Sequence, residues 1–365
     1  MKILQLITRQ QRRGAEIFAS QLSSALQSNG HEVEVLCLFD GNGDLPFEGE
    51  IKSLHADPNK RFFDWKSWKK LAEFIREFKP DIIQANASET LKFAVLSQLV
   101  LGWTNPIVYR NANQISGFLR NGLQKNWNKF LLNRVAGIAS VSEASVNDLI
   151  QTFQLKSKPI RVIPIGIDSN EIDEKQKKGS NLLLPESFLI QIGGLVPEKD
   201  PLGMIPIFEK LSEDLPDLHL VLMGSGRLEN EMIYNIEATD LAQRVHLIPN
   251  QQNIFPILGK AKALVMPSKI EGLPGVILEA MYCQIPVIAY GVGGIPEVLK
   301  SGETGWLIQP GDSDAFTQAI LECLSLPDQA RHKITKTAKK KVEEKYQIGR
   351  IAEEFEAFYK ELLNL

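Results

Sequence analysis

The segment PSKIEGLPGVILEAMYCQIPVIAYGVGG, from Pro267 to Gly294, decides which fold the sequence predicts. It begins at the end of one short apolar run, AKALVMP (Ala261–Pro267), and contains another, IPVIAY (Ile285–Tyr290). Runs of this length and composition are typical of buried parallel strands. The residues between them, from about Val276 to Cys283, predict a helix. The segment is therefore a strand–helix–strand unit of an α/β protein.

Two glutamates, Glu271 and Glu279, flank the turn inside this segment. We expect Glu271 on the loop after the first strand and Glu279 about one turn into the helix. Ligands of open α/β sheets bind at the carboxyl ends of the strands, and a helix N-terminus favours an anion, phosphate above all. Two acids beside a phosphate would repel it, so we expect them to accept hydrogen bonds from hydroxyls. A ligand that has phosphate in its middle and hydroxyls at both ends is a sugar nucleotide.

This arrangement resembles the signature of the family 4 retaining glycosyltransferases of the GT-B fold. That signature is a pair of glutamates separated by seven residues, which Glu271 and Glu279 match. The flanks also match: PS before the first glutamate, EAM around the second, then PVIA and GGIPEV. The resemblance covers most of the C-terminal half and, more thinly, the N-terminal half. The alternative is a surface glutamate followed by a glutamate that merely caps a helix.

The resemblance implies an α/β architecture of two Rossmann-like domains, whose parallel sheets face each other across a cleft. The sequence supports this, because strand-like runs alternate with amphipathic helical segments in two series. The first series is KILQLI, EVEVLCL, DIIQA, PIVYR, GIASV and RVIPI, and the second is SFLIQIG, LHLVLMG, VHLIP, ALVMP, PVIAY and GWLIQ.

The polar segment Asp168–Leu184 separates the two series and is the candidate linker. We therefore expect an acceptor-binding domain over residues 1–167 and a donor-binding domain over residues 168–345. In the family the last helix crosses back to the first domain. Ile348–Leu363 has the apolar spacing to do so, and residues from about 346 to 365 are assigned to the first domain.

The resemblance also implies roles for individual residues. Glu279 should bind the ribose hydroxyls, and Glu271 should hold hydroxyls of the donor sugar near the reacting carbon. Lys199 should stabilise the leaving diphosphate; the alternative is a solvated lysine in the first turn of a helix. The remaining donor contacts are expected from Gly193, Gly194, Gly272, Leu273, Gly275, Val276, Gly14 and Arg13.

The phosphate site departs from the family pattern at two places. Many members have an arginine where this chain has Gly194, so one of two expected cations is missing. Many also have a pair of glycines after the first strand, where this chain has Arg13 and Gly14. Arg13 or Arg227 could replace the missing cation, and the alternative for Arg13 is a side chain in solvent.

The acceptor site departs from the pattern as well. Many relatives carry a histidine in the loop after the fourth strand, and the corresponding segment Tyr109–Gln114 has none. Arg110 and Asn111 are the candidate acceptor contacts, with plain loop structure as the alternative. The resemblance implies a glycan or a lipid-linked molecule as acceptor, in the assembly of cell-surface polysaccharide or glycolipid.

The segment Phe118–Arg134 interleaves aromatic with basic residues and contains no acidic residue. Such a segment could contact an anionic membrane. The alternative is a helix whose aromatic residues pack inward and whose basic residues form a solvated face.

Composition restricts the partners and the compartment. A net charge of −3 gives no reason to expect binding to nucleic acid. Cys37, Cys283 and Cys323 are odd in number and far apart, which indicates reduced thiols. The start, MKILQLITRQQ, has too short an apolar run for a signal peptide and predicts a first buried strand. We therefore expect a cytoplasmic protein, peripheral to the inner face of the membrane if Phe118–Arg134 binds lipid.

The sequence gives no reason to expect a metal or another cofactor. It contains no CxxC or HExxH motif, and its histidines are scattered. The DxD triplet Asp312–Asp314 follows Pro310-Gly311 and precedes a helical pattern, so Asp312 is expected to cap that helix.

The function that the resemblance implies is retaining, metal-independent transfer of a sugar from a nucleoside diphosphate to a hydroxyl acceptor. One alternative is a sugar-nucleotide epimerase of the same fold, which would need further acids or histidines around the hexose. Another is a nucleotide-sugar-binding subunit that has lost activity, which the departures at Gly194 and Arg13 would permit.

Overall fold

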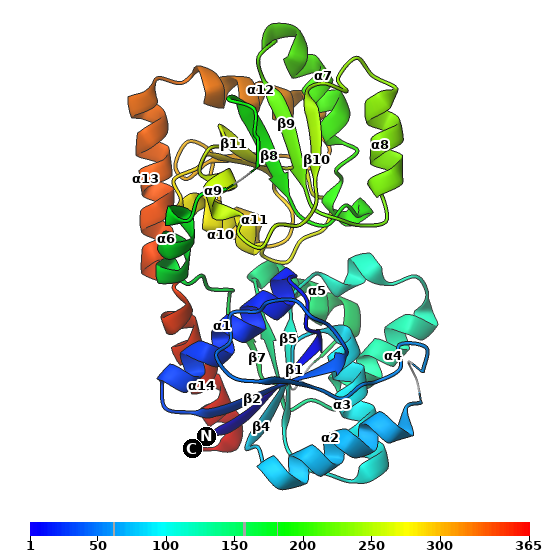
Figure 1. The fold of residues 1–365 in the computed structure, drawn as a ribbon. Helices are drawn as coiled ribbons and strands as arrows, with labels where there is room; N and C mark the ends of the chain where they lie inside the picture. The colour runs from blue at the N-terminus through cyan, green and yellow to red at the C-terminus, as the bar shows by residue number, and fades with distance from the viewer. Residues whose placement is uncertain (61–62, 156–157, 181) are drawn as a thin grey trace. The chain divides into compact units, whose positions relative to one another are not determined.

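The computed structural model describes residues 1–60, 63–155, 158–180 and 182–365. The chain forms two compact units, and each contains one parallel sheet with its helices (Figure 1). Unit 1 comprises residues 1–167 and 348–365, and unit 2 comprises residues 168–347. The second segment of unit 1 thus begins at Ile348, where a helix starts, rather than at about residue 346.

Across the described residues of unit 1, seven strands form the sheet in the order β3-β2-β1-β4-β5-β6-β7. The strands are β1 (Lys2–Arg9), β2 (Glu32–Phe39), β3 (Ile51–Ser53), β4 (Ile82–Ala85), β5 (Ile107–Asn111), β6 (Gly137–Ser140) and β7 (Ile160–Val162). The sequence predicts all of these except β3. That strand is a half-buried edge strand of sequence IKS, too short to show an apolar alternation.

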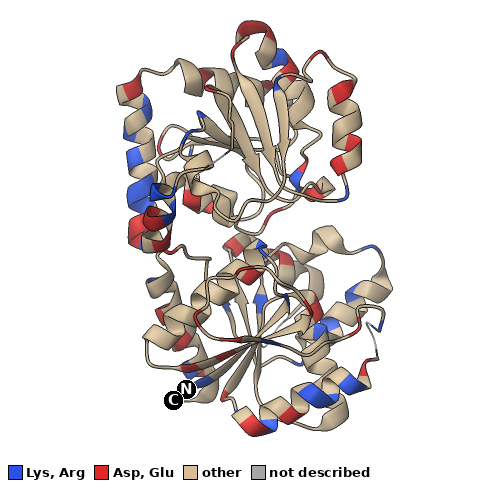
Figure 2. Cartoon of the chain, in the orientation of Figure 1, with Lys and Arg blue, Asp and Glu red and all other residues tan. Residues whose placement is uncertain are grey.

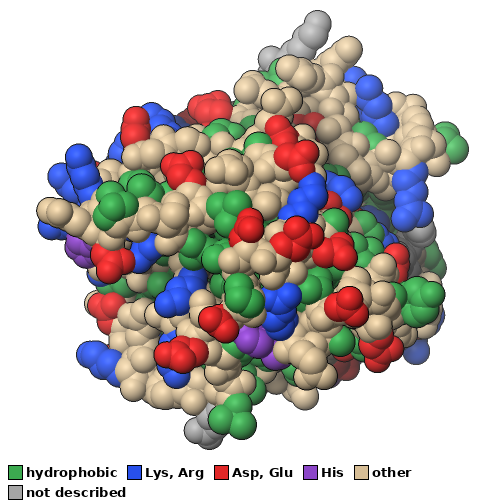
Figure 3. Space-filling view, turned by 90° about the horizontal axis from the view of Figure 1, so that it is seen from above, with side chains coloured by type: hydrophobic (Ala, Val, Ile, Leu, Met, Phe, Trp, Pro, Cys, Tyr) green, Lys and Arg blue, Asp and Glu red, His purple; other side chains and the backbone are tan. Residues whose placement is uncertain are grey.

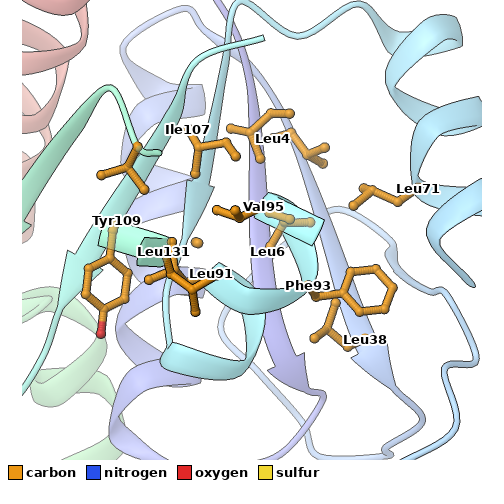
Figure 4. Close-up of a cluster of buried hydrophobic side chains, with 14 of the residues drawn as sticks. Leu4, Leu6, Leu38, Leu71, Leu91, Phe93, Val95, Ile107, Tyr109 and Leu131 are labelled. Atoms are coloured by element: carbon orange, nitrogen blue, oxygen red, sulfur yellow. The ribbon is translucent and has the colours of Figure 1, made fainter. Parts of the chain in front are cut away.

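The helices of unit 1 cover both faces of its sheet. They are α1 (Gly14–Ser28), α2 (Trp65–Phe78), α3 (Ser88–Leu101), α4 (Gly122–Leu132), α5 (Glu143–Phe153) and α14 (Ile348–Leu363), with a 3₁₀ turn η1 (Ile115–Phe118). Helices α2 to α5 pack on one face. Figure 4 shows part of that core, which includes Leu91 and Val95 of α3 and Leu4 and Leu6 of β1.

Helix α14 packs beside α1 in unit 1, as Figure 1 shows. Its apolar face buries Ile351, Phe355, Phe358 and Tyr359. A β-carbon at Gly137 of β6 would lie 2.7 Å from the Phe358 ring, so this close packing requires glycine there. The return of the last helix to the first domain is confirmed.

In the described part of unit 2, six strands form the sheet in the order β10-β9-β8-β11-β12-β13. They are β8 (Phe188–Ile192), β9 (His219–Met223), β10 (Val245–Ile248), β11 (Ala263–Met266), β12 (Val287–Tyr290) and β13 (Trp306–Ile308). All six are predicted by the second series of apolar runs. A parallel sheet buried on both faces gives continuous apolar strands, which makes them easy to recognise.

The helices of unit 2 are α6 (Ser169–Lys177), α7 (Met204–Asp214), α8 (Glu229–Glu237), α9 (Phe255–Leu258), α10 (Gly275–Tyr282), α11 (Ile295–Val298), α12 (Ser313–Ser325) and α13 (Asp328–Lys345), with a 3₁₀ turn η2 (Pro197–Lys199). Residues of α7, α8 and α12 form the core on one face of the sheet.

The linker prediction for Asp168–Leu184 was wrong over its first half. Asp168 caps α6 by accepting hydrogen bonds from the Asn170 and Glu171 amides, and Ile172 is buried. The charged residues of this segment form the exposed face of a short amphipathic helix rather than an extended linker. Residue 181 of this segment lies outside the described residues.

Charged side chains of both signs are mixed over the surface. The face in Figure 3 shows acidic and basic groups interspersed, and Figure 2 shows many Lys and Arg residues on α13. On that helix Lys340 pairs with Glu344 at 3.7 Å, whereas Lys341 donates hydrogen bonds to the carbonyl oxygens of Glu297 and Val298. No helix in the described ranges is both long enough and apolar enough to cross a membrane.

Each sheet has one point at which the strand order reverses: between β1 and β4 in unit 1, and between β8 and β11 in unit 2. Loops at the carboxyl ends of the two strands diverge there to opposite faces, and open α/β sheets bind ligands in the crevice between such loops. The two reversal points are therefore where functional residues are expected.

Candidate donor site in unit 2

Lys199 and Glu271 meet at the reversal point of the unit 2 sheet. Lys199 follows β8 and ends the turn η2, while Glu271 lies on the loop after β11. Lys199 Nζ is 2.6 Å from both carboxylate oxygens of Glu271. The Glu271 side chain is only 4% exposed and that of Lys199 is 28% exposed. Glu271 is thus not the surface glutamate of the alternative reading, and Lys199 is not a solvated lysine.

The loop that carries Glu271 is fixed on both sides by backbone hydrogen bonds. The amides of Lys269 and Ile270 donate to the Glu198 carbonyl oxygen at 2.9 and 3.2 Å. The Gly294 amide, after β12, donates to the Gly272 carbonyl oxygen. The loops after β8, β11 and β12 are therefore joined into one rigid edge around the carboxylate.

The backbone of Lys199 is held by two hydrogen bonds, and its side chain is partly exposed. Its amide donates to the Val196 carbonyl oxygen, and its own carbonyl oxygen accepts from Gln191 Nε2 at 2.9 Å. The lysine stem passes over Gly193, where a β-carbon would lie 3.9 Å from three of its carbon atoms. A β-carbon at position 193 would therefore be in ordinary van der Waals contact with the lysine stem.

The loops after β8 and β9 interlock through two glycines. A β-carbon at Gly224 would lie 1.8 Å from the Gly193 carbonyl oxygen, and one at Gly226 would lie 2.3 Å from that of Leu195. At Gly194, by contrast, the nearest atom to a β-carbon would be 3.7 Å away. A β-carbon therefore fits without a clash at the position where the family pattern has arginine.

Arg227 follows this pair of loops and brings a second cation to the same edge of the sheet. One of its guanidinium nitrogens, Nη2, lies 3.6 Å from Glu198 Oε1, and Glu198 directly precedes Lys199. The Arg227 side chain is mostly exposed, so its pairing with Glu198 is weak and leaves it able to turn toward a ligand.

Helix α10 begins beside Glu271, at Gly275 rather than at Val276, and ends at Tyr282. Its first turn presents backbone N–H groups that have no partner within the helix, including those of Gly275 and Val276. Pro274 precedes the helix and has no N–H to offer. Glu279 lies within the helix, as the sequence predicts, and it is half-buried.

The thiol and phenol at the end of α10 are held in their neutral forms. Burial, reinforced by Glu279, raises the pKa of Cys283 to about 12. Burial and the Asp173 carboxylate raise the pKa of Tyr282 to about 12, and its hydroxyl donates to Asp173 Oδ2 at 3.0 Å. Cys283 is therefore a poor nucleophile, and Tyr282 serves to join α10 to α6.

Arg13 and Gly14 lie at the start of α1 in unit 1, after β1. Arg13 precedes the helix with an extended backbone and an exposed side chain, and Gly14 has open space around its α-carbon. Both therefore lie at the reversal point of the unit 1 sheet, on the side where β1 ends.

Arg110 and Asn111 both lie in strand β5, and the loop begins at Ala112. The predicted run PIVYR ends at Arg110, so the strand extends one residue further, to Asn111. Arg110 is 3% exposed and places its guanidinium 4.1 Å from the centre of the Phe18 ring. Its Nε and Nη1 atoms have no hydrogen-bond partner among the described residues. Burial lowers the pKa of Arg110 to about 10. Asn111 is fully buried and donates from Nδ2 to Ser140 Oγ at 3.0 Å.

Glu16 is a buried acid near Arg110 that the sequence did not single out for a role. Burial raises its pKa, against a hydrogen bond from Gln11 and the positive charges of Arg13 and Arg110. A chain of buried amides runs across the same face of the sheet, where Gln84 donates to Asn86 and Asn86 donates to Gln5. In the sequence, these amides could have been found as polar residues, such as Gln5 and Gln84, within otherwise apolar strands.

The DxD triplet is structural. Asp312 Oδ1 accepts a hydrogen bond from the Ala315 amide at 2.9 Å and caps α12, as predicted, and Asp314 pairs with Lys210 on α7.

Two family models match consecutive parts of the chain. The model described as Glycosyltransferase Family 4 matches residues 12–171, and the model described as Glycosyl transferases group 1 matches residues 172–341. The two matches meet close to the boundary between the compact units, and together they span both sheets.

Two curated relatives align over most of the chain. N-acetyl-alpha-D-glucosaminyl L-malate synthase of Bacillus anthracis is 23% identical over 372 residues, which cover 96% of this chain and 94% of the relative. The capsular polysaccharide biosynthesis glycosyltransferase CapM of Staphylococcus aureus is 26% identical over 355 residues, which cover 89% and 88%.

The fold is that of a solved structure, Anabaena HepE in complex with UDP-glucose. The TM-score is 0.80 at 22% identity, and the alignment covers 99% of this chain and 100% of that one. At this identity the likeness concerns the fold, and it confirms the predicted pair of Rossmann-like domains.

Proposed function

This chain belongs to the family 4 glycosyltransferases of the GT-B fold, and from this we propose that it transfers a sugar from a nucleoside diphosphate, a UDP- or GDP-sugar, to a hydroxyl acceptor. The observation that supports the proposal most is the meeting of Lys199 and Glu271 at the reversal point of the unit 2 sheet. Lys199 offers a cation to the diphosphate, and the buried Glu271 carboxylate offers an acceptor to the sugar hydroxyls. Helix α10, which begins nearby, carries Glu279 for the ribose of the nucleotide.

Each part of the donor has a group assigned to it. Glu279 binds the ribose hydroxyls, Glu271 binds hydroxyls of the donor sugar, and Lys199 binds the diphosphate. Backbone amides in the loops around them complete the site, because N–H groups at a helix start favour an anion. These belong to Gly194, Gly272, Leu273, Gly275 and Val276. The Gly193 amide already donates to the Met223 carbonyl oxygen, so Gly193 would contribute close approach of its backbone instead.

We propose that transfer retains the configuration of the sugar. The bond between the reacting carbon and the diphosphate oxygen breaks while the acceptor oxygen bonds on the same face. The departing phosphate oxygen takes the acceptor's proton, so the protein supplies positioning and charge stabilisation. Lys199 and Arg227 supply the positive charge that stabilises the leaving diphosphate. We propose that the reaction requires no metal and no further cofactor.

We infer that the acceptor is a glycan or a lipid-linked molecule used in cell-surface polysaccharide or glycolipid assembly. The CapM relative is a capsular polysaccharide biosynthesis glycosyltransferase, which supports this setting. Arg110 and Asn111 remain the proposed acceptor contacts. Because both are buried in β5, a contact with Arg110 would involve only a small polar group that reaches its unpaired nitrogens.

The segment Phe118–Arg134 supports a peripheral position at the inner face of an anionic membrane, with the active protein in the cytoplasm. Leu123 is 81% exposed, and Phe118 and Phe130 are also exposed. Arg134 lies over the Phe130 ring at 4.8 Å, and Trp127 stacks on the same ring while packing against the core. We expect vesicles containing phosphatidylserine to bind the wild type more strongly than Leu123→Asp, and vesicles of phosphatidylcholine alone to bind both weakly.

Thermal-shift and calorimetric titration with UDP, GDP, ADP, TDP and CMP, with and without EDTA, tests the donor site. Stabilisation by one nucleoside diphosphate, unchanged by the chelator, is the expected result, because a ligand that binds only the folded state raises its stability. No stabilisation by any of them would contradict the proposal. Binding without turnover of the corresponding nucleotide sugar would favour an inactive binding subunit, and turnover to an isomer would favour an epimerase.

A further inference from the structure

Lys199 and Glu271 bind each other, although the proposed donor needs each of them for a different part of the ligand. The ammonium lies 2.6 Å from both carboxylate oxygens, so these two opposite charges largely neutralise each other. With a nucleotide sugar in place, the ammonium has to face the diphosphate and the carboxylate has to face the sugar. Donor binding therefore requires this ion pair to exchange its partners.

Only one member of the pair is free to move. Glu271 is almost completely buried, and its loop is fixed by the bonds from Lys269, Ile270 and Gly294 described above. Lys199 has a fixed backbone, but its stem lies along Gly193 and its head is partly exposed. The exchange therefore consists of the lysine head leaving the carboxylate, while Glu271 stays in place.

The buried carboxylate cannot be left without a partner. A buried charge that loses its counter-ion is strongly destabilised, so Lys199 can leave only when other donors replace it. The hydroxyls of an intact donor sugar are such donors. A free nucleoside diphosphate has no sugar at this position, and its phosphates compete with Glu271 for the same ammonium.

We propose that Glu271 is a specificity residue that makes the site favour the intact nucleotide sugar over the nucleoside diphosphate product. The inference rests on the proposed function and concerns the release of the nucleoside diphosphate after sugar transfer. While the sugar is present, its hydroxyls occupy Glu271 and Lys199 binds the diphosphate. Once the sugar has been transferred, Glu271 binds Lys199 again, and the diphosphate loses a cation and dissociates.

Calorimetric titration of the full chain with UDP and UDP-glucose, and in parallel with GDP and GDP-mannose, tests this exchange. Glu271→Gln keeps the shape of the side chain and removes the charge that holds Lys199. We expect this variant to bind the free diphosphate about tenfold more tightly than the wild type, a change of ~1.4 kcal/mol. The preference for the intact donor should shrink at the same time. Unchanged or weaker binding of the diphosphate would overturn the inference.

Two further variants keep the test decisive. Glu271→Asp retains the charge but, being one methylene shorter, moves it away from Lys199. It should tighten diphosphate binding by a smaller factor than Glu271→Gln. If Glu271→Gln does not fold, the result for Glu271→Asp tests the inference. Glu279→Gln removes the carboxylate assigned to the ribose and should weaken diphosphate and intact donor alike. A wild type that binds none of the four ligands would overturn the proposed function, and this inference with it. If the wild type binds a nucleoside diphosphate and its nucleotide sugar, but Glu271→Gln does not bind the diphosphate more tightly, the inference alone is overturned.

Discussion

Gly293 approaches Glu271 so closely that a β-carbon at position 293 would lie 2.1 Å from the Glu271 carbonyl oxygen. Gly293 also has a φ of +56°, in the left-handed region that favours glycine. The adjacent Gly294 amide bonds to Gly272. The loop after β12 thus fixes the backbone that carries the buried carboxylate, and it can do so only with glycine at position 293.

Gly293→Ala should therefore displace the Glu271 loop and impair both stability and catalysis. We expect a loss of about 1–3 kcal/mol in the free energy of unfolding, because strain and a backbone clash act together. Gly302→Ala is the matched control, since Gly302 also has a positive φ of +75° but no atom near its β-carbon position. It should lose stability and keep its transfer rate. Equal rates for the two variants would show that the contact with Glu271 does not matter.

Glu271→Ala should abolish transfer while the fold stays intact. The variant removes the group proposed to hold the donor sugar, and we expect a loss of roughly 10³-fold in kcat/KM, the size seen when one group that stabilises a transition state is removed. Circular dichroism and thermal unfolding check the fold. Glu303→Ala, an exposed glutamate of the same unit, serves as the control. A near wild-type rate for Glu271→Ala would contradict the proposed donor site.

Arg227→Ala should weaken binding of the nucleoside diphosphate by about fivefold to tenfold, the loss expected for one charge-assisted hydrogen bond. Gly194→Arg in the same chain should restore the affinity, because a β-carbon fits at position 194 without a clash. Calorimetric titration of the single and double variants measures both effects. Unchanged affinity in Arg227→Ala would show that Arg227 does not supply the second cation.

The fold could be predicted almost completely from local sequence patterns. The six strands of unit 2 are short apolar runs, and α14 has the predicted bounds of Ile348–Leu363. The cap formed by Asp312 is also local, since donor and acceptor lie three residues apart. Strand β3 and helix α6 were missed because their sequences are too short or too polar to show a period.

The candidate site could be predicted only in part. The positions of Glu271 and Glu279 follow from the strand and helix around them, but the ion pair between Lys199 and Glu271 joins residues 72 apart in the chain. No spacing rule predicts such a pair. The burial of Arg110 is equally unpredictable, because a charged residue near the end of a strand normally indicates a loop or an exposed edge.

Arg110→Met should separate stability from function in unit 1. A buried guanidinium with two unpaired nitrogens is costly, so replacing it with an apolar side chain should stabilise the unit by roughly 1 kcal/mol, or raise its Tm by about 2–4 °C. If Arg110 also contacts the acceptor, the KM for the acceptor should rise while donor affinity stays unchanged. Arg161→Met, which removes an ion pair with Glu361 at the surface, is the control. A destabilised Arg110→Met variant would show that Arg110 is a structural group paired in solution.

Stability of unit 2 should fall as the pH drops below about 6.5, because of a pair of histidines on β9 and β10. His219 Nδ1 and His246 Nε2 are 2.9 Å apart. Burial lowers the pKa of His219, Arg244 lowers it further, and Asp217 opposes them; burial and His219 lower the pKa of His246. In the unfolded chain both histidines have ordinary pKa values near ~6.5, so below that pH the unfolded state binds more protons than the native state.

The midpoint of unfolding, measured from pH 8 to pH 5.5, checks this expectation. His246→Gln removes one imidazole and its repulsion with the other, so the midpoint should fall less steeply with pH than in the wild type. His332→Gln, at an exposed position on α13, should keep the wild-type slope. Equal slopes for wild type and His246→Gln would mean that carboxylates, and not this pair, set the acid limit of unit 2.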